Sequence, residues 1–300
     1  MSSVLPEGYN WGICITHDVD HLSHKEHSIW ELIKFQATCK IEVFRLRRSM
    51  LSYLKVVKNS IFTKKDSWNC VDEMCDLDFK HRIPSTFFFA MNSGRGLRYT
   101  RDQAKGSIRN IPFNFEIGVH GQFQDNLNEM KDEYATLYNI LTRKPRGIRM
   151  HYLAQKPEML KFLKESGYEY DSTEFDKSGE LKQAYKTPEG LVEIPIHLMD
   201  TYMFSPFYEN LKVKKAKEKM EALIQKAKQE NKIINIIVHQ RSLSEDLPRQ
   251  REFYLWLVDL VSKDEKCWRT SCMKIAARVN EKLSSPQAFK TSGEEKENGN

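Results

Sequence analysis

The chain has 300 residues, of which 40% are hydrophobic and 29% are charged, and its formal net charge is +6. This composition is ordinary for a globular protein, and the length allows one large domain with a sizeable core. Much of the positive charge falls in one stretch, 25–65, where ten Lys and Arg residues outnumber three Asp and Glu residues and give +7 (10 − 3). The remainder is close to neutral, which argues against a general nucleic-acid-binding protein.

The sequence carries no pattern typical of export or membrane insertion. Residues 1–12 contain no apolar core preceded by positive charge, as a secretory signal would. No run approaches the roughly 18 apolar residues that a membrane span requires. The six cysteines form no Cys-x-x-Cys pair and have no histidine at zinc-finger spacing. We therefore expect reduced thiols and a cytoplasmic location.

Short apolar runs rich in β-formers alternate with helical patterns along the chain. Such alternation predicts parallel β–α units. Strands are expected at 11–16, 85–91, 115–120, 147–152, 168–171, 191–199, 233–239 and 267–270, and helices at 68–81, 127–141, 157–166, 212–229, 250–262 and 273–283.

Two segments stand outside this alternation. Residues 26–66 are basic and carry apolar side chains such as Ile29, Ile33 and Leu54, which predicts an inserted helical pair. Its charged face is expected either to be solvated or to contact an anionic surface peripherally at the inner membrane face. Residues 284–300 are polar and are expected to be a disordered tail. The sequence thus predicts one domain, 1–283, that contains this insertion.

Polar and ionisable residues cluster where the predicted strands end. In an α/β barrel, the carboxyl ends of the strands meet at one mouth, where active sites form. Any one of these residues alone could be a cap or turn residue, but their occurrence on separate strands predicts a shared site. They are Asp18, Asp20, His120, Arg149, His151, Asp171, Asp200 and His239.

The order of these segments resembles the polysaccharide deacetylases with a NodB-homology domain, carbohydrate esterase family 4. The resemblance is greater to a divergent branch whose first motif reads THDVD, here 16–20, and whose third reads RxHYL, here 149–153. It covers about 11–283 and implies a distorted (β/α) barrel with about seven strands. It also implies a divalent-metal hydrolase that removes N-acetyl groups from a sugar or glycan precursor.

The first motif implies different roles for two carboxylates, with Asp18 as general base and Asp20 as metal ligand. Side chains two positions apart in an extended chain face the same side, so both can serve one site. Asp-x-Asp also opens the motif of the haloacid dehalogenase phosphatases, but the residues that follow here, His21 and Leu22, fit that motif poorly.

The metal-ligand set implied by the family is altered in this chain. The second motif is His-x-x-x-His, of which only His120 is kept, and Gln124 stands at the second position. In the third motif, Arg-x-Pro-aromatic, His151 replaces the proline. His151 is therefore the candidate for the missing ligand, with Gln124, Asp125 or water as alternatives. Imidazole and carboxylate ligands favour zinc.

The resemblance assigns roles to the remaining residues. Arg149 is expected to orient and ionise Asp18, and His239, at the end of an apolar strand, is expected to act as general acid. Asp171 falls in the region where an Asp often supports the arginine, and Asp200 is expected to contact either the substrate or Arg149. The residues expected in supporting or substrate-binding roles are Tyr152, Asp171, Asp200 and Gln124.

These assignments predict a zinc-dependent carbohydrate deacetylase acting in surface polysaccharide or lipopolysaccharide biosynthesis. Two alternatives stay open. Loss of the second histidine of motif two suits a degenerate family member that binds a glycan or a protein partner without catalysis. Related folds also cleave C–N bonds in non-sugar amides.

Overall fold

The computed structural model describes residues 4–26, 66 and 68–284. The expected helical insertion and polar tail therefore lie almost wholly outside the described residues, and so does the membrane contact expected of the basic stretch. Within the described residues, no helix is long and apolar enough to cross a membrane.

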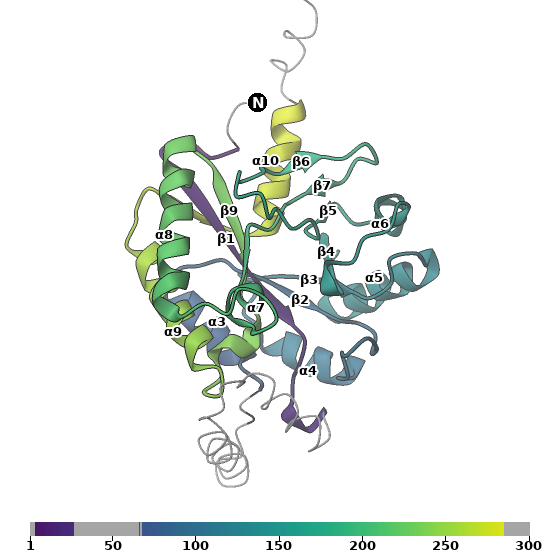
Figure 1. Cartoon of the computed structure of the whole chain (residues 1–300). Coiled ribbons are helices and arrows are strands. Elements are labelled where there is room, and N and C mark those ends of the chain that lie inside the picture. The colour runs from purple at the N-terminus through teal and green to yellow at the C-terminus, as the bar shows by residue number, and fades with distance from the viewer. Residues whose placement is uncertain (1–3, 27–65, 67, 285–300) are drawn as a thin grey trace, which may run out of the picture.

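A curled sheet of ten strands forms the centre of the molecule (Figure 1). Nine of the ten strands fall at the eight expected runs, because the run 191–199 contains two of them. The central strand β1 (Trp11–Val19) is buried along its whole length. Pairing is parallel throughout, except where β6 joins β7. The strands are β1 (Trp11–Val19), β2 (Thr86–Phe89), β3 (Glu116–Gly121), β4 (Gly147–Met150), β5 (Tyr170–Asp171), β6 (Tyr185–Lys186), β7 (Val192–Glu193), β8 (Leu198–Met199), β9 (Ile233–Ile237) and β10 (Cys267–Thr270).

One extended segment, 192–199, brings the two sides of the sheet together. Its first part, β7, pairs with β5, and its last part, β8, pairs with β9. The change of partner falls around Pro195, which has no N–H to donate to a ladder, while Ile194 N donates to Asp171 O and His197 N to Asn235 O. The expected barrel is confirmed, and its strand count differs slightly from the expected number of about seven. The segment 192–199 forms two short strands, β7 and β8, and closes the sheet into a ring. Strands β6 and β10 lie outside this ring, where they pair with β7 and β1.

Helices surround the sheet, as Figure 1 shows. Six of the eight α-helices among the described residues fall where the pattern predicted them, but α4 (Arg101–Asn110) and α7 (Asp200–Phe204) were not predicted. Only Ala104 and Ile108 of α4 are buried, so its apolar pattern is weak, although Thr100 and Gln103 form a capping box at its start. The helices are α3 (Val71–Lys80), α4 (Arg101–Asn110), α5 (Leu127–Leu141), α6 (Met159–Ser166), α7 (Asp200–Phe204), α8 (Val213–Glu230), α9 (Pro248–Ser262), α10 (Cys272–Ser284) and the 3₁₀ helices η1 (His24–Glu26), η3 (His151–Leu153) and η4 (Gln240–Leu243).

The two ends of the ring differ. Helix α10 covers the end where strands begin, because Cys272 N donates to Thr86 Oγ1 and Met273 N to Glu116 Oε2, and these acceptors open β2 and β3. Inside the barrel, the aromatic side chain of Tyr170 fills the space beside Gly147. A Cβ atom at position 147 would lie 1.8 Å from that side chain. The opposite end, where strands finish, is left for the polar residues.

Candidate functional site

Strand β1 delivers two carboxylates to the mouth of the ring. Asp18 lies in the strand and Asp20 directly follows it. Because side chains alternate along a strand, Thr16 and Asp18 share a face, and both accept hydrogen bonds from Arg149 Nη1, at 2.6 and 2.8 Å. The Asp18 side chain is buried, and Asp20 is partly open to the mouth.

Asp20, His120 and His151 form a group that can hold a metal ion. Asp20 Oδ1 lies 3.3 Å from His120 Nε2 and 3.7 Å from His151 Nδ1. The two ring nitrogens are 3.1 Å apart. A tetrahedral zinc ion with bonds of about 2.0–2.1 Å separates its ligands by roughly 3.3–3.4 Å, so these three atoms stand at the spacing of metal ligands.

The backbone partners of the two rings support the same conclusion. His120 Nδ1 donates to Arg149 O and His151 Nε2 donates to Arg95 O, both at 3.1 Å, since a carbonyl only accepts. When both rings are neutral, each therefore turns a lone pair toward Asp20 Oδ1, a buried oxygen with no hydrogen-bond partner among the described residues. Three electron-pair donors facing one another repel unless a cation lies between them, and such backbone partners orient metal-binding histidines.

Electrostatics keep His151 in the form that a metal requires. Burial, followed by the neighbouring His120, lowers the pKa of His151 to about 4. The ring is therefore neutral near pH 7, and neutral imidazole is the ligand form. The alternatives to His151 point elsewhere, because Gln124 Nε2 donates to Gln122 O at 2.9 Å and Asp125 pairs with Lys156 at 2.8 Å. The donor set present thus fits a divalent metal.

Arg149 crosses the interior of the ring to reach Asp18. Its side chain is fully buried, and its guanidinium carbon lies 4.5 Å from the centroid of the Phe88 ring. Burial raises the pKa of Asp18, but the charges of Arg149 and then of His120 and His239 outweigh it and lower that pKa. Asp18 is consequently held as a carboxylate, the form that a general base needs.

The support of Arg149 differs from the expectation. Asp171 was expected to hold it, but the Asp171 carboxylate accepts from Thr173 at 2.5 Å, and burial raises its pKa to about 6. Ser172 holds Arg149 instead, through its carbonyl and its Oγ, both at 2.8 Å. Side chains alternate at this point of the chain, so a shift of one position decides which residue faces the arginine.

His239 and Asp200 form a second pair on the other side of Asp20. Asp200 Oδ1 accepts from His239 Nδ1 at 2.6 Å, and Asp200 Oδ2 accepts from His239 N at 2.8 Å. This leaves His239 Nε2 facing the mouth, 3.6 Å from Asp20 Oδ2. Burial lowers the pKa of His239, but the Asp200 carboxylate outweighs burial and raises it to about 10. Asp200 thus contacts His239 and not Arg149, which was one of the two partners expected for it.

Tyr152 stands at the rim, next to the metal group. Its side chain is 68% exposed, and its ring centroid lies 3.9 Å from that of His151. Its backbone has a φ of +58°, which is uncommon for a residue other than glycine and is typical of functional loops. This turn directs His151 inward and Tyr152 outward.

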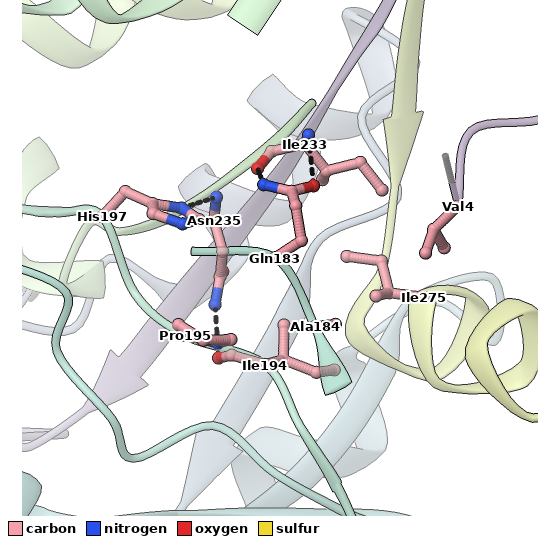
Figure 2. A pocket seen from close by; sticks show the side chains of 9 residues that line it. All are labelled: Val4, Gln183, Ala184, Ile194, Pro195, His197, Ile233, Asn235 and Ile275. Carbon is pink, nitrogen blue, oxygen red and sulfur yellow. Dashed lines mark hydrogen bonds between the residues drawn. The ribbon is translucent and has the colours of Figure 1, made fainter. Parts of the chain in front are cut away.

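Sequence reasoning missed a further contributor, Asn235. It is the one polar residue in the apolar strand β9, and that interruption was the available signal. Asn235 Nδ2 donates to Ser172 Oγ at 3.1 Å, so it supports the serine that holds Arg149. Its backbone N donates to His197 Nδ1 at 2.9 Å beside a cavity of about 10 Å³ (Figure 2). That cavity has room for about one water molecule and none for a sugar.

Comparison with known proteins agrees with this geometry. The family model described as WbmS-like polysaccharide deacetylase matches residues 66–235. The match includes His120, Arg149 and His151. Asp18, Asp20 and His239 lie outside it and are assigned to the site by their distances to Arg149, His120 and one another. No curated protein matches the chain.

Solved structures share the fold over almost the whole chain. A protein assigned to the polysaccharide deacetylases from Mycobacterium smegmatis is 18% identical, with a TM-score of 0.63 and coverage of 94% of both chains. A second such protein, from Pseudomonas aeruginosa, is 13% identical, with a TM-score of 0.65 and coverage of 94% of this chain and 95% of that one. Puue allantoinase is 14% identical, with a TM-score of 0.63 and coverage of 94% of both chains. At these identities the likeness concerns the fold alone, and it confirms the expected barrel; the family match establishes that the chain belongs to the WbmS-like polysaccharide deacetylases.

Proposed function

We propose that this protein is a metal-dependent deacetylase that removes the N-acetyl group from a sugar unit of a glycan or glycan precursor. One observation carries the proposal: Asp20, His120 and His151, a group that can hold a metal ion, stand beside a carboxylate whose pKa is lowered, Asp18, and a histidine whose pKa is raised, His239. Membership of a polysaccharide deacetylase family supports a carbohydrate substrate.

The roles follow from the contacts of each side chain. A divalent ion held by Asp20, His120 and His151, which we propose to be zinc, supplies Lewis acidity toward the acetamide carbonyl and the attacking water. Asp18, kept as a carboxylate by Arg149, accepts the proton of that water. His239, which Asp200 keeps protonated, donates a proton to the departing nitrogen of the sugar.

This arrangement requires a proton donor and a proton acceptor at neutral pH, and the environments supply both. The pKa of Asp18 is lowered and that of His239 is raised to about 10, so the two pKa values lie further apart than in water. Such divergence of neighbouring groups is typical of acid–base catalysis. It argues for catalysis over a binding protein that has lost activity.

The test is the Asp18→Asn variant. It should lose at least a hundredfold in turnover of N-acetylated sugars, while elemental analysis still finds about one metal ion per chain. The control is His151→Ala, which should lose both turnover and metal. Full activity of Asp18→Asn would refute Asp18 as base, and a purified, zinc-reconstituted protein that retains no metal would refute the enzyme.

A C–N hydrolase acting on a non-sugar amide is the second candidate. The fold shared with an allantoinase favours keeping it, because fold alone does not choose the substrate. A panel of N-acetylated mono- and oligosaccharides beside cyclic and acyclic amides separates the two. Surface polysaccharide or lipopolysaccharide biosynthesis is the role that we propose for the sugar activity.

A further inference from the structure

A groove of about 600 Å³ lies at the end of the barrel opposite the metal group. Its lining includes Pro84 and Asn114, just before β2 and β3, and Cys267, the first residue of β10. The volume falls within the range of small-molecule sites, about 300–1,000 Å³. We call it the basic groove, because the described residues that line it include four cations and no acid: Lys80, Arg82, Arg269 and Lys274.

The fold leaves this space because β1 changes its neighbour along the edge away from β9. Cys14 pairs with Thr270 at the end of β10. Two residues later, Thr16 pairs with Thr86 at the start of β2. Strand β10 therefore ends where β2 begins, and side chains fill the junction where a continuous strand would otherwise run.

Arg269 is held in this junction with donors to spare. Its Nη1 donates to the carbonyl of Val261 at 2.8 Å and, at 3.3 Å, to those of Ser262 and Asp264. Carbonyl groups carry no net charge, so they orient the guanidinium without neutralising it. Nε and Nη2 donate to no acceptor among the described residues. A guanidinium fixed in this way suits the oxygens of a phosphate group.

Two further cations of the groove occupy positions where the local backbone disfavours them. Arg82 has a φ of +55° just beyond α3, the left-handed conformation that glycine usually supplies after a helix. Lys274 lies in the first turn of α10, where the positive end of the helix dipole disfavours a cation. Neither side chain pairs with a carboxylate in the described part of the chain. Local structure therefore does not explain these two cations, whereas an anionic ligand does.

From this arrangement we propose that the basic groove binds a ligand with two linked phosphate groups. One phosphate monoester carries a charge of about −1.5 to −2 near pH 7, so a diphosphate matches four cations more closely. Phe79, which also lines the groove, is 64% exposed and offers its face to an aromatic ring. A nucleoside diphosphate is the class of ligand that combines both features. The site is separate from the proposed function and uses neither the metal nor the catalytic groups.

Calorimetric titration of the full-length protein tests the proposal, with pyrophosphate, ADP and inorganic phosphate as probes. Wild-type protein should bind one pyrophosphate or one ADP per chain, and both more tightly than inorganic phosphate. Arg82→Gly and Lys274→Glu should each weaken pyrophosphate binding about five- to tenfold. The matched control is Lys214→Glu, an exposed lysine in the first turn of α8 that does not line the groove, and it should bind as the wild type does.

Two further measurements separate the site from other effects. Glycine at 82 and glutamate at 274 suit the local backbone better, so neither variant should have a lower melting temperature than the wild type. Because diphosphates also bind zinc, each titration is made on zinc-loaded and on metal-free protein, and the groove predicts equal affinities. Affinity that disappears with the metal would place the ligand at the metal group and refute the proposal.

The remaining outcomes decide the rest. Unchanged pyrophosphate affinity in both groove variants would refute the site, and so would an equal loss in Lys214→Glu, which would show an effect of net charge alone. If vesicles containing phosphatidylserine bind through Arg82 and Lys274 while free pyrophosphate and ADP do not bind, the free ligand is refuted in favour of a membrane surface. If Phe79→Ala binds ADP as tightly as the wild type does, the diphosphate site stands and the nucleoside is refuted.

Discussion

Replacing Arg149 with methionine removes the guanidinium that donates a hydrogen bond to Asp18 inside the barrel. The arginine is fully buried, and methionine replaces most of its stem but none of its hydrogen bonds to Thr16, Asp18 and Ser172. The Asp18 carboxylate is left in the interior without its partner. Breaking a buried ion pair in this way costs about 3–5 kcal/mol, and Asp18→Asn alone, which leaves the guanidinium unpaired, should cost a comparable amount.

The double variant shows whether the pair is the cause. With both charges removed, neither partner is left uncompensated, so Arg149→Met with Asp18→Asn should be about 2 kcal/mol or more stable than the sum of the single changes predicts. The measurement is urea unfolding followed by circular dichroism on metal-free proteins at pH 7. Arg146→Met is the control, because its pair with Glu169 is about half exposed and should contribute less than about 1 kcal/mol. Additivity within about 0.5 kcal/mol would refute the coupling.

Three further predictions concern the metal, a buried acid and the Asp200–His239 pair. Chelation should lower the melting temperature of the zinc-loaded protein by about 5–10 °C, which is the effect of a ligand present at a hundred times its dissociation constant. It should leave the melting temperature of His120→Ala unchanged; an equal decrease in both proteins would contradict the metal site. Burial raises the pKa of Glu133 from 4.5 to about 8, so its ionisation opposes folding and the free energy of unfolding falls as pH rises between these values, by about 1.4 kcal/mol per pH unit. Glu133→Gln should remove this slope in urea unfolding from pH 5 to 8, whereas Glu129→Gln in the same helix should keep it. Asp200→Asn removes the charge that keeps His239 protonated and should lower kcat at pH 7 about a hundredfold with the metal content unchanged; a kcat near that of the wild type would exclude this role.

The sequence alone determined the local parts of this structure. Hydrophobic runs marked the central strands, and helical periodicity predicted α5 at its observed bounds, Leu127–Leu141. The ends of the runs also marked where Asp18, His120 and His239 emerge, because in parallel β–α units each strand delivers its last residues to the same mouth. These features depend on neighbouring residues, so a single sequence contains them.

Tertiary structure decided which side chains meet. Ser172, not Asp171, holds Arg149, and the partner of Asp200 is His239, 39 residues away. Ring closure depends on the segment 192–199 changing partners from β5 to β9. A shift of one residue turns a side chain to the other face of a strand, and the pairing that sets such positions joins segments far apart in the chain. Local pattern brought the catalytic groups to one mouth, and only the packing of distant strands decided which of them touch.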